Sequence, residues 1–251
     1  MLNRRRFLGA AGAGTALLTM PQFLVGCAKS ASSTLPTTTP ENPFLAWFGV
    51  DEAMLRRVMT ELTSRGATHA DAYFQHTRAN SIVMEDGIVS QAYSNIEQGV
   101  GLRVVVGDQV GYAFTEDLTE PAMLAAARTA AAIASGKSEL APQHFTYRKS
   151  DAGRYKVAVP WGEVGVDKKL PRIQKAEALA RAGDPSIKKV SVYWTDSEER
   201  VMVVNKGGRI VTDMRPMARM YINLTAEKGG KQQSNGSNIA GRRGIEWFDD
   251  A

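Results

Sequence analysis

The chain has 251 residues, a formal net charge of +5 and one cysteine. A single cysteine excludes an internal disulfide framework and a thiolate cluster for zinc. Arg4, Arg5 and Arg6 supply three of the positive charges, so the rest of the chain carries +5 less 3, or +2. Because no lysine- or arginine-rich stripe follows, no nucleic-acid partner is expected.

Residues 1–27 have the pattern of an export signal. Arg4 and Arg5 precede an uncharged apolar run over residues 7–25, which closes at Leu24-Val25-Gly26-Cys27. A positive start, an apolar run and a small-residue site are typical of a secretory signal, and the paired arginine indicates the twin-arginine route. The closing tetrapeptide also resembles a bacterial lipobox, which implies a lipid on Cys27 and an exported, membrane-anchored protein on the periplasmic or cell-surface side. An uncleaved anchor and plain cleavage stay open, because about 20 apolar residues can span a bilayer.

Residues 28–48 are predicted to be a flexible tether. Residues 29–43 are rich in Ser, Thr and Pro. Such a stretch cannot bury a core and is typical of linkers. The folded part is therefore expected to begin near residue 49.

A first folded unit is predicted over residues 49–140, as a helix, an antiparallel meander and a second helix. Asp51 is the expected N-cap of a helix that runs to about Ser64, with apolar residues at helical spacing. Asp86-Gly87 predicts a tight hairpin between short runs rich in β-branched and aromatic residues. The expected strands are 70–77, 81–85, 88–93, 99–106 and 110–115, and the closing helix runs from Thr119 to about Ser135.

A second unit is predicted over residues 141–251. Asp167 is the expected cap of a helix that ends near Ala182, with Leu170, Ile173, Ala176 and Leu179 or Ala180 on its inner face. The expected strands are 187–195, 200–205, 209–213 and 217–227. Residues 197–200 are interpreted as a solvated turn, and residues 229–244 as a glycine-rich loop.

The predicted fold class is therefore α+β, with two adjoining units of helix and antiparallel sheet. Each unit places a hairpin between a helix and a further strand. Two explanations stay open: a weak internal duplication, or the layout that any two α+β units share.

The sequence offers no evident active site. His69 and His76 fall on opposite faces of a predicted strand, and no H-E-x-x-H occurs. Gly229-Gly230-Lys231-Gln232 is not a phosphate loop, because Gln replaces the Ser or Thr that reaches magnesium. Gly229, Gly230 and Gly236 are candidates for close backbone approach to a peptide in a channel, and a plain connector is the alternative.

Several motifs resemble one known family. The first group is Gly66-Ala67-Thr68-His69-Ala70-Asp71-Ala72-Tyr73, Glu85-Asp86-Gly87, Gly99-Val100-Gly101-Leu102-Arg103 and Gly111-Tyr112-Ala113-Phe114. The second includes Gly183-Asp184-Pro185-Ser186, Asn205-Lys206-Gly207-Gly208, Asp213-Met214-Arg215-Pro216 and Gly244-Ile245-Glu246-Trp247-Phe248. In order and spacing they are similar to the N-terminal half of the TldD/PmbA metalloproteases, and Asp213-Met214-Arg215-Pro216 resembles the catalytic TldD branch.

The resemblance implies a zinc peptidase that acts on unfolded peptides and pairs with a related subunit. It places the zinc ligands, an H-E-x-x-x-H helix and a later cysteine, in a C-terminal half. We therefore expect no cofactor in this chain, no catalysis by it alone, and a contribution of channel and subunit-pairing surface. Two alternatives remain: a non-catalytic lipoprotein module that binds a peptide or partner, and a structural lipoprotein.

Overall fold

The structure is a computed structural model that describes residues 42–133, 144–148, 154–155 and 157–249. Residues 39–251 form one compact unit, to which all of these belong. Arg4, Arg5, Cys27 and most of the predicted tether lie outside the described residues.

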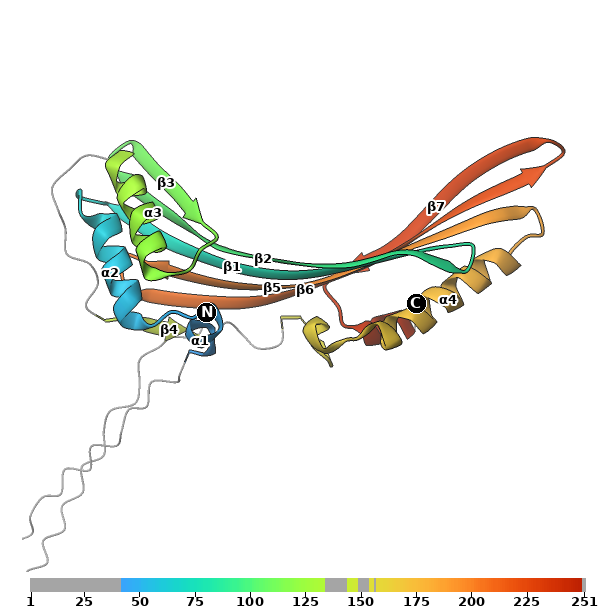
Figure 1. The fold of residues 1–251 in the computed structure, drawn as a ribbon, viewed down its shortest axis with the longest axis horizontal. Coiled ribbons are helices and arrows are strands. Elements are labelled where there is room, and N and C mark those ends of the chain that lie inside the picture. Colours follow the sequence, from blue (N-terminus) through green and yellow to red (C-terminus); the bar gives the residue numbers. More distant parts are fainter. Residues whose placement is uncertain (1–41, 134–143, 149–153, 156, 250–251) are drawn as a thin grey trace, which may run out of the picture. The chain divides into compact units, whose positions relative to one another are not determined.

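One seven-stranded sheet organises the described chain (Figure 1). Its strand order is β3-β2-β1-β5-β6, and β4 and β7 both pair with β6. Every pairing is antiparallel except that of β4 with β6. The strands are β1 His69–Glu85, β2 Ile88–Val106, β3 Gln109–Thr115, β4 Thr146–Arg148, β5 Ile187–Asn205, β6 Arg209–Lys228 and β7 Lys231–Gly241. The predicted α+β class with a largely antiparallel sheet is confirmed.

The helices lie near the ends of the long strands. Figure 1 shows α2 and α3 beside one end and α4 beside the other. Helix α3 packs on β3, α2 packs mainly on α3, and α4 packs on β5. The helices are α1 Pro43–Phe48, α2 Glu52–Thr63, α3 Glu120–Ile133 and α4 Val166–Ala182, with short 3₁₀ turns η1 Trp161–Glu163 and η2 Ile245–Asp249. Among the described residues, none of the helices has the length and apolar character to cross a membrane.

The two predicted units share this sheet. Strands β1 and β5 pair from Asp71 with Asn205 to Glu85 with Ser191. The hairpin β1–β2 of the first unit therefore lies beside the hairpin β5–β6 of the second. The predicted boundary near residue 140 falls outside the described residues.

The tether predicted over residues 28–48 extends too far. Its last six residues form α1, capped by the Asn42 side chain, which accepts a hydrogen bond of 3.0 Å from the Phe44 backbone N–H. Phe48 is buried against Phe74, with ring centroids 5.5 Å apart. The aromatic residues that follow Pro43 supply the apolar surface that the Ser/Thr/Pro-rich stretch lacks, so the chain orders before residue 49.

The strands are longer than the sequence predicted. Each of β1, β2, β5 and β6 joins two predicted strands across a polar gap. The polar side chains in these gaps have partners within the sheet: Asn80 donates to Asp196 at 2.7 Å, and Arg200 pairs with Glu198 at 2.6 Å. Residues 197–200 are therefore mid-strand, and the solvated turn predicted there was wrong.

The glycine-rich tail is also more regular than predicted. Residues 231–241 form β7, which pairs with β6 from Lys228–Lys231 to Ala218–Gly241. Only Gly229 and Gly230 form a turn, with φ of 58° and 72°, values that glycine adopts without steric cost. The predicted loop over residues 229–244 was therefore wrong for most of its length.

One face of the sheet carries two hydrophobic clusters. Even-numbered residues of β1 and β5 point to this covered face, and the odd-numbered residues point to the opposite, open face. The first cluster joins α1, α2 and α3 to the sheet through residues such as Leu55, Phe74, Leu102 and Met123. The second joins α4, η1 and η2 to it through Trp161, Ile173, Trp194 and Phe248.

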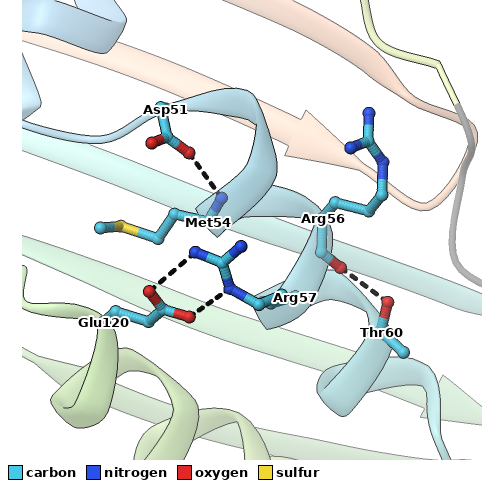
Figure 2. Close-up of polar contacts among 6 residues, drawn as sticks. All are labelled: Asp51, Met54, Arg56, Arg57, Thr60 and Glu120. Carbon is cyan, nitrogen blue, oxygen red and sulfur yellow. Dashed lines mark hydrogen bonds and ion pairs between the residues drawn. The ribbon is translucent and has the colours of Figure 1, made fainter.

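At the first end, helix α2 is held as its sequence predicts. The Asp51 carboxylate accepts a hydrogen bond of 2.7 Å from the Met54 backbone N–H, which satisfies one free donor of the first turn (Figure 2). Leu55, Val58, Met59 and Leu62 are buried. Arg57 joins α2 to α3 through two bonds to the Glu120 carboxylate, of which the Nη2 bond is 2.8 Å.

At the second end, helix α4 differs from the prediction. It begins at Val166 with Gly165 at the N-cap and no side-chain cap, so Asp167 is not its cap. Its buried residues are Lys169, Ile173 and Glu177, whereas Leu179 is 65% exposed. The predicted inner face is confirmed at Ile173, which is buried, and at Leu170 and Ala180, which pack against the same cluster. Of the alternatives Leu179 and Ala180, the structure selects Ala180, and the periodicity did not predict the buried Lys169 and Glu177.

Candidate functional site

No metal centre is present in the part of the chain that the structure describes. No group of three or more His, Cys, Asp or Glu side chains there could hold an ion. His69 and His76 lie on opposite faces of β1, and His144 precedes β4. These residues do not fit zinc, which needs three or four converging ligands.

The open face has an ionic cluster at its centre. Arg215 donates from Nε to Asp213 at 2.8 Å, and its Nη1 lies 3.6 Å from Glu199. Burial and then the negative charge of Glu199 raise the pKa of Tyr73, whereas Arg215 opposes that shift. The hydrogen bond to Asp213 is the largest cause that raises the pKa of Arg215. The cluster thus places two residues of Asp213-Met214-Arg215-Pro216 on the open face.

A pocket of about 610 Å³ lies to one side of this cluster. Its floor contains Gly99 and Gly101 of β2, which lack side chains, and Tyr73, Tyr112 and Phe114 are among its walls. Glu97 and Glu116 also line it. The pocket has the size of a small-ligand or side-chain site, and its aromatic and acidic lining suits a cation.

A second pocket, of about 420 Å³, lies along the same face between β2 and β6. Its lining includes Tyr93, Tyr193, Tyr221 and Arg219. The rings of Tyr193 and Tyr221 are 5.7 Å apart, and the Arg219 guanidinium lies 5.5 Å from the Tyr221 ring. The open face therefore offers a series of aromatic surfaces beside charged groups.

The three glycines proposed from the sequence do not form one site. Gly229 and Gly230 make the β6–β7 turn, with open space around each. Gly236 lies within β7 under the ring of Tyr221, whose hydroxyl occupies the place a Cβ would take. Contact of these residues with a peptide stays a prediction.

The pockets were not predicted from the sequence, although their signals are present in it. Gly99-Val100-Gly101 and Tyr112-Ala113-Phe114 alternate in phase, and the register pairs Gly101 with Phe114. Alternation puts the glycines and the aromatic rings on one face. The arrangement can bind an extended or cationic group, and the described residues include no metal centre for hydrolysis.

Two family domains match in sequence order. Residues 70–134 match PmbA/TldA metallopeptidase domain 1, and residues 159–250 match the PmbA/TldA metallopeptidase central domain. The chain belongs to the TldD/PmbA family. The sequence resemblance is thereby confirmed at the level of the family.

Relatives of TldD agree with this assignment. A metalloprotease TldD homolog from Haemophilus influenzae is 28% identical over 209 residues, which cover 82% of this chain and 43% of the relative. A metalloprotease TldD homolog from Buchnera aphidicola is 24% identical over 190 residues, covering 76% of this chain and 39% of the relative. The chain therefore spans less than half the length of these TldD relatives.

Solved structures of the family share the fold. A Bacteroides thetaiotaomicron protein, described as a candidate modulator of DNA gyrase, has a TM-score of 0.59 at 13% identity, with 76% of this chain and 45% of that chain covered. TldE from Thermococcus kodakarensis has a TM-score of 0.55 at 18% identity, with 75% and 42% covered. At such identities the likeness concerns the TldD/PmbA fold alone.

Proposed function

We propose that this chain is the N-terminal part of an exported TldD-like zinc metalloprotease that acts on unfolded peptides. In this proposal it supplies substrate-channel and subunit-pairing surface, a related family subunit pairs with it, and zinc is bound by residues outside this sequence. The observation that carries the proposal is the match to two consecutive metallopeptidase domains.

The test compares the chain alone with a longer product. The 251-residue chain is assayed for zinc content and for cleavage of an unfolded casein substrate, with and without a chelator. It is then joined to the C-terminal portion of the Haemophilus influenzae relative and assayed with a related subunit. We expect zinc binding and chelator-sensitive cleavage only in the longer product. Submicromolar zinc affinity or chelator-sensitive cleavage by the chain alone would contradict the proposal.

A second candidate is a lipoprotein module that binds a peptide or partner without cleaving it. The pockets on the open face favour it, because they lie wholly within this chain. A longer coding sequence with an in-frame H-E-x-x-x-H would favour the protease. Peptide binding by a gene product that ends at Ala251 would favour the module.

We further propose twin-arginine export and lipid attachment at Cys27, with anchoring on the periplasmic or cell-surface side. The paired arginine and the small residues before Cys27 support this. A double Arg4→Lys and Arg5→Lys variant of a reporter fusion should stay in the cytoplasm. Cys27→Ala should abolish labelling by a radioactive fatty acid. Unchanged export and labelling in these variants would overturn the localisation.

A further inference from the structure

Strand β2 has a long edge without a strand partner in the described chain. On one side β2 pairs with β1 along its whole length. On the other side β3 pairs only with Val100 to Val106. The remaining segment, Ile88–Gln98, is exposed at every position. We call it the free edge of β2.

The free edge has few of the features that usually protect an edge strand. It contains neither Pro nor Lys, and Glu97 is its only charged residue. Ile88 is 72% exposed, Tyr93 62% and Ile96 59%. An edge of this kind presents unpaired backbone N–H and C=O groups over about 36 Å, which an extended chain can satisfy by strand addition.

The free edge leads directly to the acidic aromatic pocket. A strand added along the free edge would lie in line with β3, because both would pair with the same side of β2. The end of the added strand nearest β3 would lie beside Glu116, the residue that follows β3, and beside Glu97 of β2. The register and side-chain alternation place both carboxylates on the open face with Phe114.

The pocket has an excess of negative charge. Asn95 donates to Glu97 at 2.8 Å, and no ion pair of Glu97 or Glu116 with a cation is found among the described residues. The nearby Arg103 is already paired with Asp71 at 2.7 Å. The rings of Tyr112 and Phe114 beside two carboxylates form a site that a lysine or arginine side chain would complement.

We propose that the free edge of β2 binds an extended polypeptide segment by strand addition, and that the adjoining pocket receives a lysine or arginine side chain of that segment. This goes beyond the proposed function, because it assigns a binding site and a charge preference outside any catalytic centre. It rests on the proposed function only in taking an unfolded peptide as the occupant.

A second copy of the chain is a poorer occupant of this edge. Two copies paired through their free edges would bring strands together that carry no lysine or arginine. The only charged side chain in each would be Glu97, so the pocket would gain no cation. A basic peptide satisfies both the backbone edge and the carboxylates.

Fluorescence anisotropy tests the proposal with labelled peptides of about twelve residues, the length of the free edge. The peptides alternate Thr and Val and carry the same variable residue, lysine, norleucine or glutamate, near each end, so that one copy lies beside the pocket in either strand direction. We expect the full 251-residue chain to bind the lysine peptide about five- to tenfold more tightly than the norleucine peptide, and the glutamate peptide least. Equal affinity for all three would overturn the charge preference.

A double Glu97→Gln and Glu116→Gln variant should bind the lysine and norleucine peptides equally well. A matched double variant, Glu52→Gln and Glu61→Gln, removes two carboxylates from helix α2 and should keep the preference. Circular dichroism melting curves establish that each variant is folded. If the control variant loses the preference as fully as the pocket variant, the pocket is not its source.

Strand addition itself is tested with lysine peptides N-methylated at every second residue, in the two alternate phases. Only one phase removes the amide hydrogens that would face β2, so one peptide should bind and the other should not. Equal binding in both phases, or a dimer of the chain that excludes every peptide, would overturn the proposal. These assays measure binding, so their failure is distinct from a failure to find hydrolysis.

Discussion

The two ends of the covered face are built from different chemistry. At the first end, helix α3 buries Met123, Ala126, Ala127, Ala130 and Ala131. Its backbone lies so close to β3 that a Cβ on Gly111 would overlap the Ala130 carbonyl oxygen. At the second end, two of the three residues that α4 buries are charged. One end depends on small apolar residues, and the other on tryptophans around an ion pair.

This difference shows where each end is vulnerable. Lys169 lies 2.7 Å from Asp196, with both side chains almost fully buried, and Trp194 donates to Asp196 at 2.8 Å. A buried ion pair adds little to stability over an apolar replacement, but removal of one partner leaves a costly unpaired charge. The apolar end should instead lose stability in proportion to the volume removed.

The largest effect is expected from Asp196→Ala. It leaves the Lys169 ammonium buried without its carboxylate, so the free energy of unfolding should fall by about 3–5 kcal/mol in urea denaturation. The double variant Asp196→Ala with Lys169→Met removes both charges and should be less destabilised than the single one. Equal losses would mean that the ion pair does not determine stability at this end.

Leu55→Ala tests the apolar end. Leu55 is fully buried, so the free energy of unfolding should fall by about 2–5 kcal/mol. Leu179→Ala in α4 is the matched control, because that side chain is 65% exposed, and it should change stability by less than about 0.5 kcal/mol. A large loss at Leu179 would mean that this side chain, and not only Ala180, belongs to the inner face of α4.

Asp51→Ala tests how the two ends begin their helices. Loss of the bond to the Met54 N–H should cost about 1 kcal/mol of unfolding free energy, measured in urea. Asp167→Ala is the comparison, since the carboxylate there caps nothing and its interaction with the helix dipole amounts to about a few tenths of a kcal/mol. Equal effects at both positions would argue against the cap assignment.

His76 gives the smallest expected effect, a pH dependence. It lies between the two ends, with its ring centroid 5.3 Å from that of Trp47. Burial, and then the positive charge of Arg200, lower the pKa of His76 from 6.5. Arg78 acts in the same direction, and Glu198 opposes it. The unfolded chain then binds the proton more readily, so stability is complete above pH 6.5 and declines as the pH falls below it. His76→Gln should flatten the slope of urea midpoint against pH between about 5 and 7, and an unchanged slope would contradict this.

The sequence predicted the apolar end well. A capping aspartate, helical spacing and the Asp86-Gly87 hairpin are local signals, and the structure contains each of them. The fold class followed from the same signals. The N-terminal signal lies outside the described residues and stays a prediction.

The polar features could not be predicted in the same way. Asn80 looked like a strand break, because its partner Asp196 lies on another strand, 116 positions later. Glu198 looked like one because a polar run is typical of turns, whereas its partner Arg200 lies two positions further along the same strand. From the sequence, Lys169 is expected on the surface, because nothing near it in the chain indicates that its buried partner is Asp196. The pocket at Gly99 and Gly101 depended likewise on a register with β3 that periodicity alone does not fix.

The pairing of β1 with β5 has a consequence for synthesis. Asp71 pairs with Asn205, 134 positions later, so β1 emerges from the ribosome long before the strand that covers its edge. At a synthesis rate of about 5–20 residues per second, the edge of β1 stays unpaired for roughly ten seconds. During this interval β1, β2 and β3 stand without β5, so the edge of β1 and the free edge of β2 are both unpaired, and unpaired edges recruit other strands. The nascent protein is therefore most exposed to misassembly while its second domain is still being made.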